Sequence, residues 1–294
     1  MTPAVAAWTF GFTLVAAVDL HGQQARLAIT PARPMPGAIV RLILTDAAAS
    51  DAIVAVAGTM AGEPLHFAGA AGSWRAIGAV PVDSGGPVVA SVVATRASGR
   101  TDTLSASVTP PPLPPPKEQL AVSEQFGKPM DAATSARVEE ENQRAMAVGR
   151  QSQSEPPKWS APFERPRDSE ISSGFGTGRT FNGQVASRHL GVDFRGALGA
   201  PIRAANAGVV ALVDNFFLGG NVVYIDHGGG LTTGYLHLSK TLVNVGDTVA
   251  RGQVIGLVGA TGRVTGPHLH WSARYGALTV NPLDLLTLEP IIGH

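Results

Sequence analysis

The segment TGPHLHW, residues 265–271, places one histidine on either side of a single leucine. Side chains of a β-strand alternate between its two faces, so a strand here puts His268 and His270 on one face and Leu269 on the other, towards the core. The two histidine Cα atoms would then lie roughly 6–7 Å apart. Either both histidines bind one metal ion, or one binds the metal while the other reaches a metal-bound water. The spacing predicts a shared face and leaves these two arrangements open.

The segment RHLGVDF, residues 188–194, contains a histidine and an aspartate four positions apart. A helix would place both on one face, but Gly191 and the β-branched Val192 disfavour a helix here. We therefore expect Asp193 to enter a strand and His189 to lie on the bend that precedes it.

The segment GYLHLS, residues 234–239, has the alternation of a half-buried strand. Alternation puts Tyr235 and His237 on one polar face, while Leu236 and Leu238 supply the packed face. The pattern predicts that His237 points to a polar surface with Tyr235 beside it.

Together, the three segments supply two or three imidazoles and one carboxylate. Without a thiolate, this is the ligand set of a catalytic zinc site that keeps one position open for water. Calcium would need more carboxylates. The chain has no cysteine, which excludes thiolate ligands and disulfides.

Other motifs do not carry chemistry. The segment DHGGG, residues 226–230, is not followed by the Lys-Ser/Thr pair of a phosphate-binding loop, so we expect a turn and assign His227 no role. No Gly-x-Ser-x-Gly nucleophile motif occurs. The segment VGDTVARGQVIGLVGATG, residues 245–262, resembles a biotinyl or lipoyl carrier hairpin, but it lacks the lysine that such a carrier must modify.

The charge and composition of the whole chain limit its partners. Lys plus Arg and Asp plus Glu both number 22 among 294 residues, so no net charge attracts nucleic acid or an anionic membrane. Aromatic residues make up 6% of the chain, which disfavours a base-stacking surface. We therefore expect no nucleic-acid partner.

The chain divides into four parts: residues 1–23, 24–109, 110–166 and 167–294. Residues 4–18 are apolar over the length of a signal-peptide core, so we expect residues 1–23 to direct export. No Lys or Arg precedes that stretch, and an apolar first strand is the alternative. No longer apolar run follows, so we expect no stable membrane insertion.

Residues 24–109 contain short alternating runs separated by turn residues, which predicts an immunoglobulin-like β-sandwich. Residues 110–166 form a proline-rich linker that begins PPPLPPP. Within the linker we expect a helix that Asp131 caps and Gly149 ends. Its apolar stripe is weak, so we expect it on a surface. Residues 167–294 are predicted to be a second all-β domain, and the chain as a whole is mainly β.

The second domain resembles the lysostaphin-type (LytM-type) zinc metallopeptidases of bacterial peptidoglycan, over about residues 171–286. The motifs His-x-x-x-Asp, Tyr-x-His-Leu and His-x-His of that family stand here as HLGVD, YLHL and HLH, and the segment SGFG..R also resembles it. The resemblance implies a β-sheet groove and one Zn²⁺ ion bound by His189, Asp193 and His270. It also implies that His237 and His268 are the unligated catalytic pair, with His268 as general base.

The resemblance implies a zinc-dependent endopeptidase that hydrolyses peptide bonds in peptidoglycan and is exported to the periplasm or cell envelope. The alternative is a non-catalytic wall-binding protein, or an activator of amidases, with the same fold. Glycine-rich cross-bridges and D-alanyl–diaminopimelate cross-links are both cleaved within the family, and the sequence leaves the choice open. The resemblance names no protein partner, and it does not cover the first domain or the linker.

Overall fold

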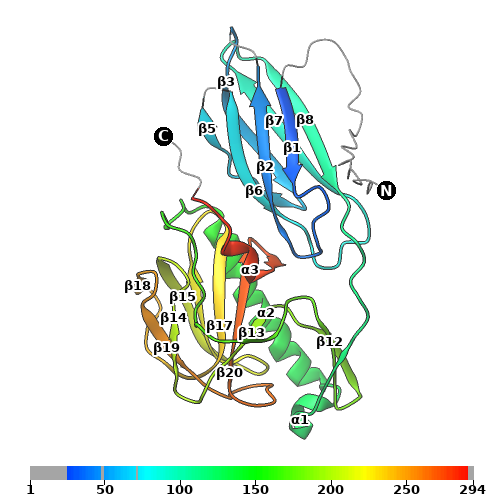
Figure 1. Cartoon of the computed structure of the whole chain (residues 1–294), viewed down its shortest axis with the longest axis vertical. Helices are drawn as coiled ribbons and strands as arrows, with labels where there is room; N and C mark the ends of the chain where they lie inside the picture. The colour runs from blue at the N-terminus through cyan, green and yellow to red at the C-terminus, as the bar shows by residue number, and fades with distance from the viewer. Residues whose placement is uncertain (1–24, 48–49, 71, 291–294) are drawn as a thin grey trace, which may run out of the picture.

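The computed structural model describes residues 25–47, 50–70 and 72–290. The expected export signal lies outside the described residues. Figure 1 shows two lobes stacked along the long axis of the molecule, with residues 25–108 in one lobe and residues 171–285 in the other. Both lobes are mainly β, as predicted.

The first lobe consists of two antiparallel four-stranded sheets packed face to face (Figure 1). One sheet has the order β1 (Ala25–Thr30), β2 (Ile39–Asp46), β6 (Ser73–Ala79), β5 (Ala68–Ala70), and the other β4 (Glu63–Pro64), β3 (Ile53–Met60), β7 (Val88–Arg96), β8 (Thr101–Val108). Side chains of both sheets form one core, to which β7 contributes alternate residues from Val88 to Ala94. This strand order is that of immunoglobulin domains, so the predicted sandwich is confirmed.

The second lobe is built on a ten-stranded sheet. Its main path runs β10 (Ile171–Ser173), β13 (Val192–Arg195), β20 (His268–Tyr275), β17 (Leu231–Thr241), β16 (Gly220–Asp226), β15 (Gly208–Phe216), β18 (Thr248–Val249). Off this path, β14 (Pro201–Arg203) pairs with β19 (Val254–Val258), β19 also pairs with β17, and β21 (Leu278–Val280) pairs with β20. Strands β16 and β17 pair antiparallel and are joined through residues 226–230, where the sequence predicts a turn. The sheet places β13, β20 and β17 side by side, and these strands come from the three histidine-containing segments.

The linker contributes a strand and two helices to the second lobe. Strand β9 (Glu118–Leu120) pairs in parallel with β11 (Gly178–Phe181), which pairs with β12 (Val185–Arg188). Helix α1 (Glu124–Gly127) follows, and then helix α2 (Ala132–Ser152), which lies against β15, β16 and β17 (Figure 1). The linker therefore supplies one edge strand, β9, of a small three-stranded sheet beside the main sheet.

Helix α2 differs from its prediction at one end. It begins as predicted, since Asp131 accepts a hydrogen bond of 2.7 Å from the amide of Thr134. It does not end at Gly149 but continues to Ser152. A Cβ atom on Gly149 would lie 1.9 Å from the carbonyl oxygen of Gly276, so this glycine serves a close approach between backbones. The side of the helix that faces the sheet buries Ala145 and Val148.

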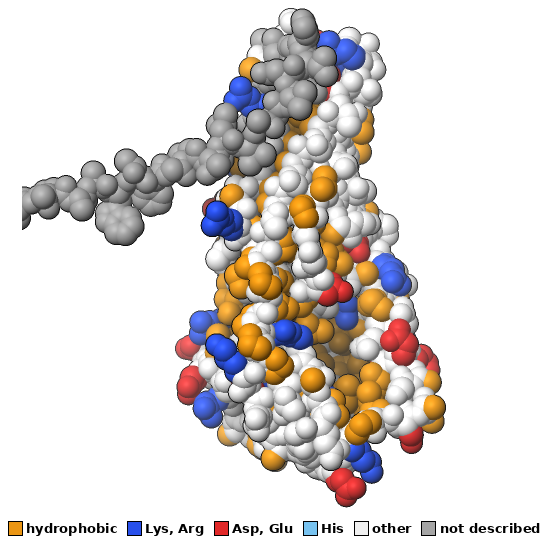
Figure 2. All heavy atoms as spheres, turned by 90° about the vertical axis from the view of Figure 1, so that its right-hand side faces the viewer, with side chains coloured by type: hydrophobic (Ala, Val, Ile, Leu, Met, Phe, Trp, Pro, Cys, Tyr) orange, Lys and Arg blue, Asp and Glu red, His pale blue; other side chains and the backbone are white. Residues whose placement is uncertain are grey.

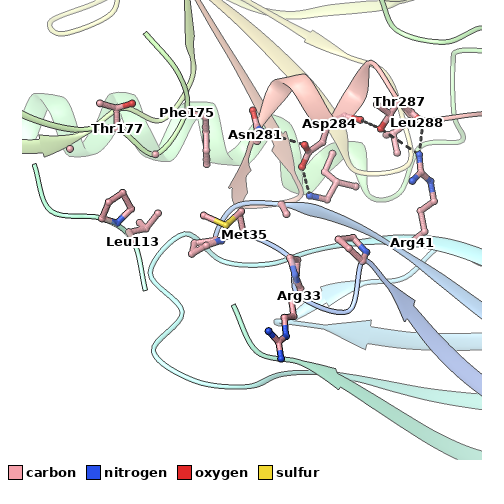
Figure 3. Close-up of a pocket in the computed structure, with 18 of the residues that line it drawn as sticks. Arg33, Met35, Arg41, Leu113, Phe175, Thr177, Asn281, Asp284, Thr287 and Leu288 are labelled. Atoms are coloured by element: carbon pink, nitrogen blue, oxygen red, sulfur yellow. Dashed lines mark hydrogen bonds between the residues drawn. The ribbon is translucent and has the colours of Figure 1, made fainter. Parts of the chain in front are cut away.

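The two lobes are in contact through helix α3 (Pro282–Leu285). The carboxylate of Asp284 accepts a hydrogen bond of 2.9 Å from the amide of Ile39, and Arg41 donates to the carbonyl of Thr287 (Figure 3). A pocket of about 570 Å³ lies at this junction, with Met35 on one side and Phe175 on the other (Figure 3). Figure 2 shows hydrophobic side chains gathered where the lobes meet.

Candidate active site

Three neighbouring strands bring the candidate residues into one cavity of about 620 Å³. In the antiparallel pair of β13 and β20, Asp193 lies directly opposite His270. His189 lies on the bend before β13, as predicted, and β17 flanks β20 on its other side. Leu269 is fully buried while the histidines on either side of it line the cavity, so the predicted alternation of the HLH segment is confirmed.

His189, Asp193 and His270 form a compact cluster at the floor of the cavity. His189 Nε2 and His270 Nδ1 each lie 2.9 Å from Asp193 Oδ1, and they lie 2.9 Å from each other. Each residue thus offers one ligand atom, and these atoms all lie within 4.8 Å of one another. The structure brings together the three residues that the sequence predicted as ligands.

Proton counting indicates that this cluster needs a cation. His189 Nδ1 lies 2.8 Å from the carbonyl oxygen of Gly174, so a neutral ring donates its single proton there. Its Nε2 lone pair then faces Asp193 Oδ1, which is also an acceptor, at 2.9 Å. Two acceptors repel each other at this distance unless a proton or a metal ion lies between them. Two imidazole nitrogens and one carboxylate oxygen, with the ring of His189 fixed by a backbone carbonyl, fit a catalytic metal site.

The second oxygen of Asp193 is held from the linker side. Arg179 donates to Asp193 Oδ2 from Nη2 at 2.7 Å and to the carboxylate of Glu118 from Nε at 2.8 Å. Glu118 belongs to β9 and also accepts a hydrogen bond of 2.8 Å from Ser173. Sequence reasoning assigned no role to Arg179 or Glu118, although Arg179 is the final residue of the SGFG..R segment.

His237 and His268 face the same cavity from β17 and β20. Each Nδ1 atom lies 2.8 Å from a backbone carbonyl oxygen, that of Thr261 for His237 and that of Gly266 for His268. The Nε2 atom of each ring therefore remains for the cavity. His268 Nε2 lies 3.7 Å from Asp193 Oδ1. The ring centroids of His237 and His268 are 4.9 Å apart. Neither ring belongs to the three-residue cluster.

His237 lines the cavity, but the predicted alternation fails for its neighbours Tyr235 and Leu236. The φ of His237 is 65°, in the left-handed region, and the register of β17 against β16 shifts between the pairs formed by Tyr235 and Leu238. As a result Leu236 and His237 line the cavity. Tyr235 is fully buried, and its hydroxyl accepts a hydrogen bond of 2.8 Å from the amide of Ala205 and lies 3.0 Å from Thr233 Oγ1. The irregular backbone turns His237 away from Tyr235 and towards the ligand cluster.

Burial affects the protonation of several groups in the cavity. It lowers the pKa of His270 to about 4 and that of His237 well below its usual value, in the latter case together with the nearby His268 and His270. Burial by itself would raise the pKa of Asp193, but contacts with His189 and His270 outweigh it and the pKa lies well below its usual range. At neutral pH the site therefore holds an ionised Asp193 and a neutral His270, which is the state that binds a metal ion.

His227 lies outside the cavity, as expected. It is fully buried, with Nδ1 2.7 Å from the carbonyl oxygen of Ala207 and Nε2 2.8 Å from the hydroxyl of Thr233. Its ring packs against Phe163 of the linker. It is a structural histidine in the interior of the second lobe.

Fold and site together define a metallopeptidase domain. Residues 187–282 match the model of Peptidase family M23, and the chain therefore contains a peptidase family M23 domain. It is 48% identical over 95 residues to the peptidoglycan DD-endopeptidase ShyA of Vibrio cholerae, and 42% identical over 102 residues to the DD-carboxypeptidase/endopeptidase Mpg of Neisseria meningitidis. These alignments cover 32% and 35% of this chain, and 22% and 24% of the relatives. The chain thus spans about a quarter of the length of these curated relatives.

One solved structure is similar over both lobes. The crystal structure of a Pseudomonas aeruginosa protein assigned to peptidase M23 superposes with a TM-score of 0.64 at 28% identity. The superposition covers 86% of this chain and 95% of that one. The similarity therefore includes the sandwich and the linker as well as the metallopeptidase domain.

Proposed function

We propose that the chain is a zinc-dependent endopeptidase that hydrolyses peptide bonds of bacterial cell-wall peptidoglycan. The observation that carries the proposal is the convergence of His189, Asp193 and His270 on one point, with two further histidines in the same cavity. The peptidoglycan endopeptidase names of the relatives support the substrate class. His189, Asp193 and His270 would hold one zinc ion, which leaves a coordination position open.

Zinc, when bound, lowers the pKa of water and polarises the substrate carbonyl. The histidines of the chain then handle the protons. His268 Nε2 is an acceptor, because Nδ1 donates to the carbonyl of Gly266, so it takes a proton from the attacking water and passes it to the leaving amine. The side chain of His268 is 15% exposed, which leaves it open to water.

His237 would stabilise the negative charge that develops on the substrate oxygen. With Nδ1 committed to the carbonyl of Thr261, its Nε2 donates only when the ring is protonated. Burial disfavours that state in the resting site, whereas an adjacent negative charge favours it. His237 would therefore take up one proton from solvent at Nε2 as the charge forms, which directs its interaction towards the transition state.

The proposal includes export to the periplasm or cell envelope, because peptidoglycan lies there. In the part of the chain that the structure describes, none of the helices has the length and hydropathy of a membrane span. The substrate is a peptidoglycan peptide, and the proposal includes no protein partner.

Digestion of purified peptidoglycan tests the proposal. We expect the full chain to release new amino groups from sacculi, to lose this activity with a chelator and to regain it with added Zn²⁺. Mass spectrometry of the products identifies the bond that is cut. A chain that binds zinc and sacculi but releases no amines would instead be the non-catalytic wall-binding protein or activator.

A further inference from the structure

One arginine of the cavity, Arg263, forms no ion pair within the part of the chain that the structure describes. Arg263 lies on the loop between β19 and β20, and its guanidinium is 4.0 Å from the centroid of the Phe181 ring. Among the described residues, no carboxylate lies within 4 Å of it, and none accepts a hydrogen bond from its side chain. The other arginines of the same cavity are engaged: Arg179 by two carboxylates, Arg195 by one, and Arg188 by two backbone carbonyls.

Burial and a neighbouring positive charge make the charged form of Arg263 unfavourable. Burial, and then the charge of Arg179, lower the pKa of Arg263 to about 10, so it stays protonated at neutral pH. A partly desolvated charge without a partner is unfavourable, and an anion in the cavity would relieve it. The Phe181 ring holds one face of the guanidinium, which leaves its edge N–H groups for a planar, two-oxygen ligand.

The loop fixes Arg263 relative to the reacting groups. The amide of Arg263 donates to the carbonyl of Leu218 at 2.9 Å. Two residues earlier, the carbonyl of Thr261 holds the ring of His237 at 2.8 Å. Five residues later the same segment enters β20 at His268. A group bound by Arg263 would therefore lie in the same cavity as both histidines.

We propose that Arg263 binds a carboxylate of the substrate peptide, and that the site thereby prefers bonds with a free carboxylate beside the scissile amide. This inference rests on the proposed function and deepens it. In a D-alanyl–diaminopimelate cross-link, the amide nitrogen is attached to a carbon that bears a free carboxylate. Inside a glycine cross-bridge, the residues beside each bond have no charge. The inference therefore assigns Arg263 the recognition of this carboxylate in the first type of cross-link.

Two substrates that differ at one group test the inference with the zinc-loaded full chain. One is a peptide dimer joined by a D-alanyl–diaminopimelate bond, and the other is the same dimer with the carboxylate next to that bond converted to a carboxamide. We expect kcat/KM to be about 10- to 100-fold higher for the carboxylate, the effect of one charged hydrogen-bonded pair. In Arg263→Gln this preference should disappear, while the rate on the carboxamide stays within about 3-fold. Arg195→Gln, which alters a paired arginine of the same cavity, should keep the preference.

A binding measurement provides a readout that does not depend on hydrolysis. Calorimetry of the chelator-treated chain with the diaminopimelate-containing product peptide should show a Kd that Arg263→Gln raises about 10-fold or more and Arg195→Gln leaves unchanged. Equal rates on both dimers, or a preference that survives Arg263→Gln, would overturn the inference and leave the proposed function standing. If the wild-type chain cleaves neither dimer, the proposed function fails, and the binding measurement alone decides the inference: an unchanged Kd in Arg263→Gln overturns it.

Discussion

Substitution of Gly191 by alanine places a methyl group against the ring of His270. We expect this change to weaken metal binding strongly while the chain still folds. Gly191 lies between two proposed ligands, and a Cβ atom there would be 2.5 Å from His270 Nε2 and 2.6 Å from the carbonyl oxygen of Trp271. Ordinary contacts of this kind begin near 3.4 Å, so Gly191→Ala creates an overlap of 3.4 − 2.5 = 0.9 Å. The ring has to move by about that distance, whereas metal–ligand distances tolerate only about 0.2 Å.

The expected effect of Gly191→Ala is a fall in zinc affinity of about 100-fold or more, because one of three ligands is displaced. The same overlap should lower the free energy of unfolding by about 1–3 kcal/mol, the usual cost of overpacking. Competition with a chromophoric chelator measures the zinc affinity, and denaturant unfolding of the metal-free chain measures the stability.

Gly174→Ala is the matched control. The carbonyl of Gly174 holds the other proposed histidine ligand, His189, but a Cβ atom on Gly174 meets no other atom within 4 Å. We expect this variant to keep its zinc affinity within about 3-fold. Wild-type affinity in Gly191→Ala would refute the reasoning, because the ring of His270 would then not be the metal ligand that the overlap displaces.

Two further predictions concern groups outside the cavity. Burial lowers the pKa of His227 to about 4 from its usual 6.5, so the unfolded chain binds the proton more tightly. Its contribution to stability is complete above pH 6.5 and is lost as the pH falls from 6.5 to 4, by up to about 3 kcal/mol; denaturant unfolding of wild type and His227→Gln should show a weaker pH dependence in the variant. In the sandwich, Arg96 is buried and forms ion pairs with Asp46 and Asp102. Arg96→Met should destabilise the sandwich by about 3–5 kcal/mol, seen as faster hydrogen exchange of the β7 amides, with zinc affinity unchanged.

Local patterns in the sequence predicted the parts of the site that depend on regular strands. The alternation of the HLH segment places Leu269 in the core and its two neighbours in the cavity, and the structure agrees. The bend before Asp193 also follows from local preferences, because Gly191 and Val192 disfavour a helix. In both cases the conformation depends on residues next to one another in the chain.

The backbone conformation and the neighbours of His237 could not be predicted in this way. Its position depends on a register shift between β17 and β16, and a histidine with positive φ has no local signature. Strict alternation therefore put it beside Tyr235, which in fact belongs to the core. The bulge is stabilised by a distant group, since the carbonyl of Thr261 lies 24 positions away in the sequence.

The groups that surround the ligands also depend on distant contacts. Arg179 reaches Asp193 from β11, and Glu118 reaches Arg179 from a strand that pairs with β11 across 61 positions of sequence. Phe181 and Arg263 meet in the same way, from β11 and the loop before β20. No local pattern predicts such pairs, because they depend on contacts between segments that lie far apart in the sequence.

Zinc content of two alanine variants tests the central claim most directly. If His270 holds the metal and His268 handles the proton, purified His270→Ala should contain little zinc, whereas His268→Ala should contain about one equivalent and fail to hydrolyse peptidoglycan. Elemental analysis alongside the amine-release assay gives both values from one preparation. A His268→Ala protein without zinc, or a His270→Ala protein that retains it, would contradict the division of roles between the two histidines.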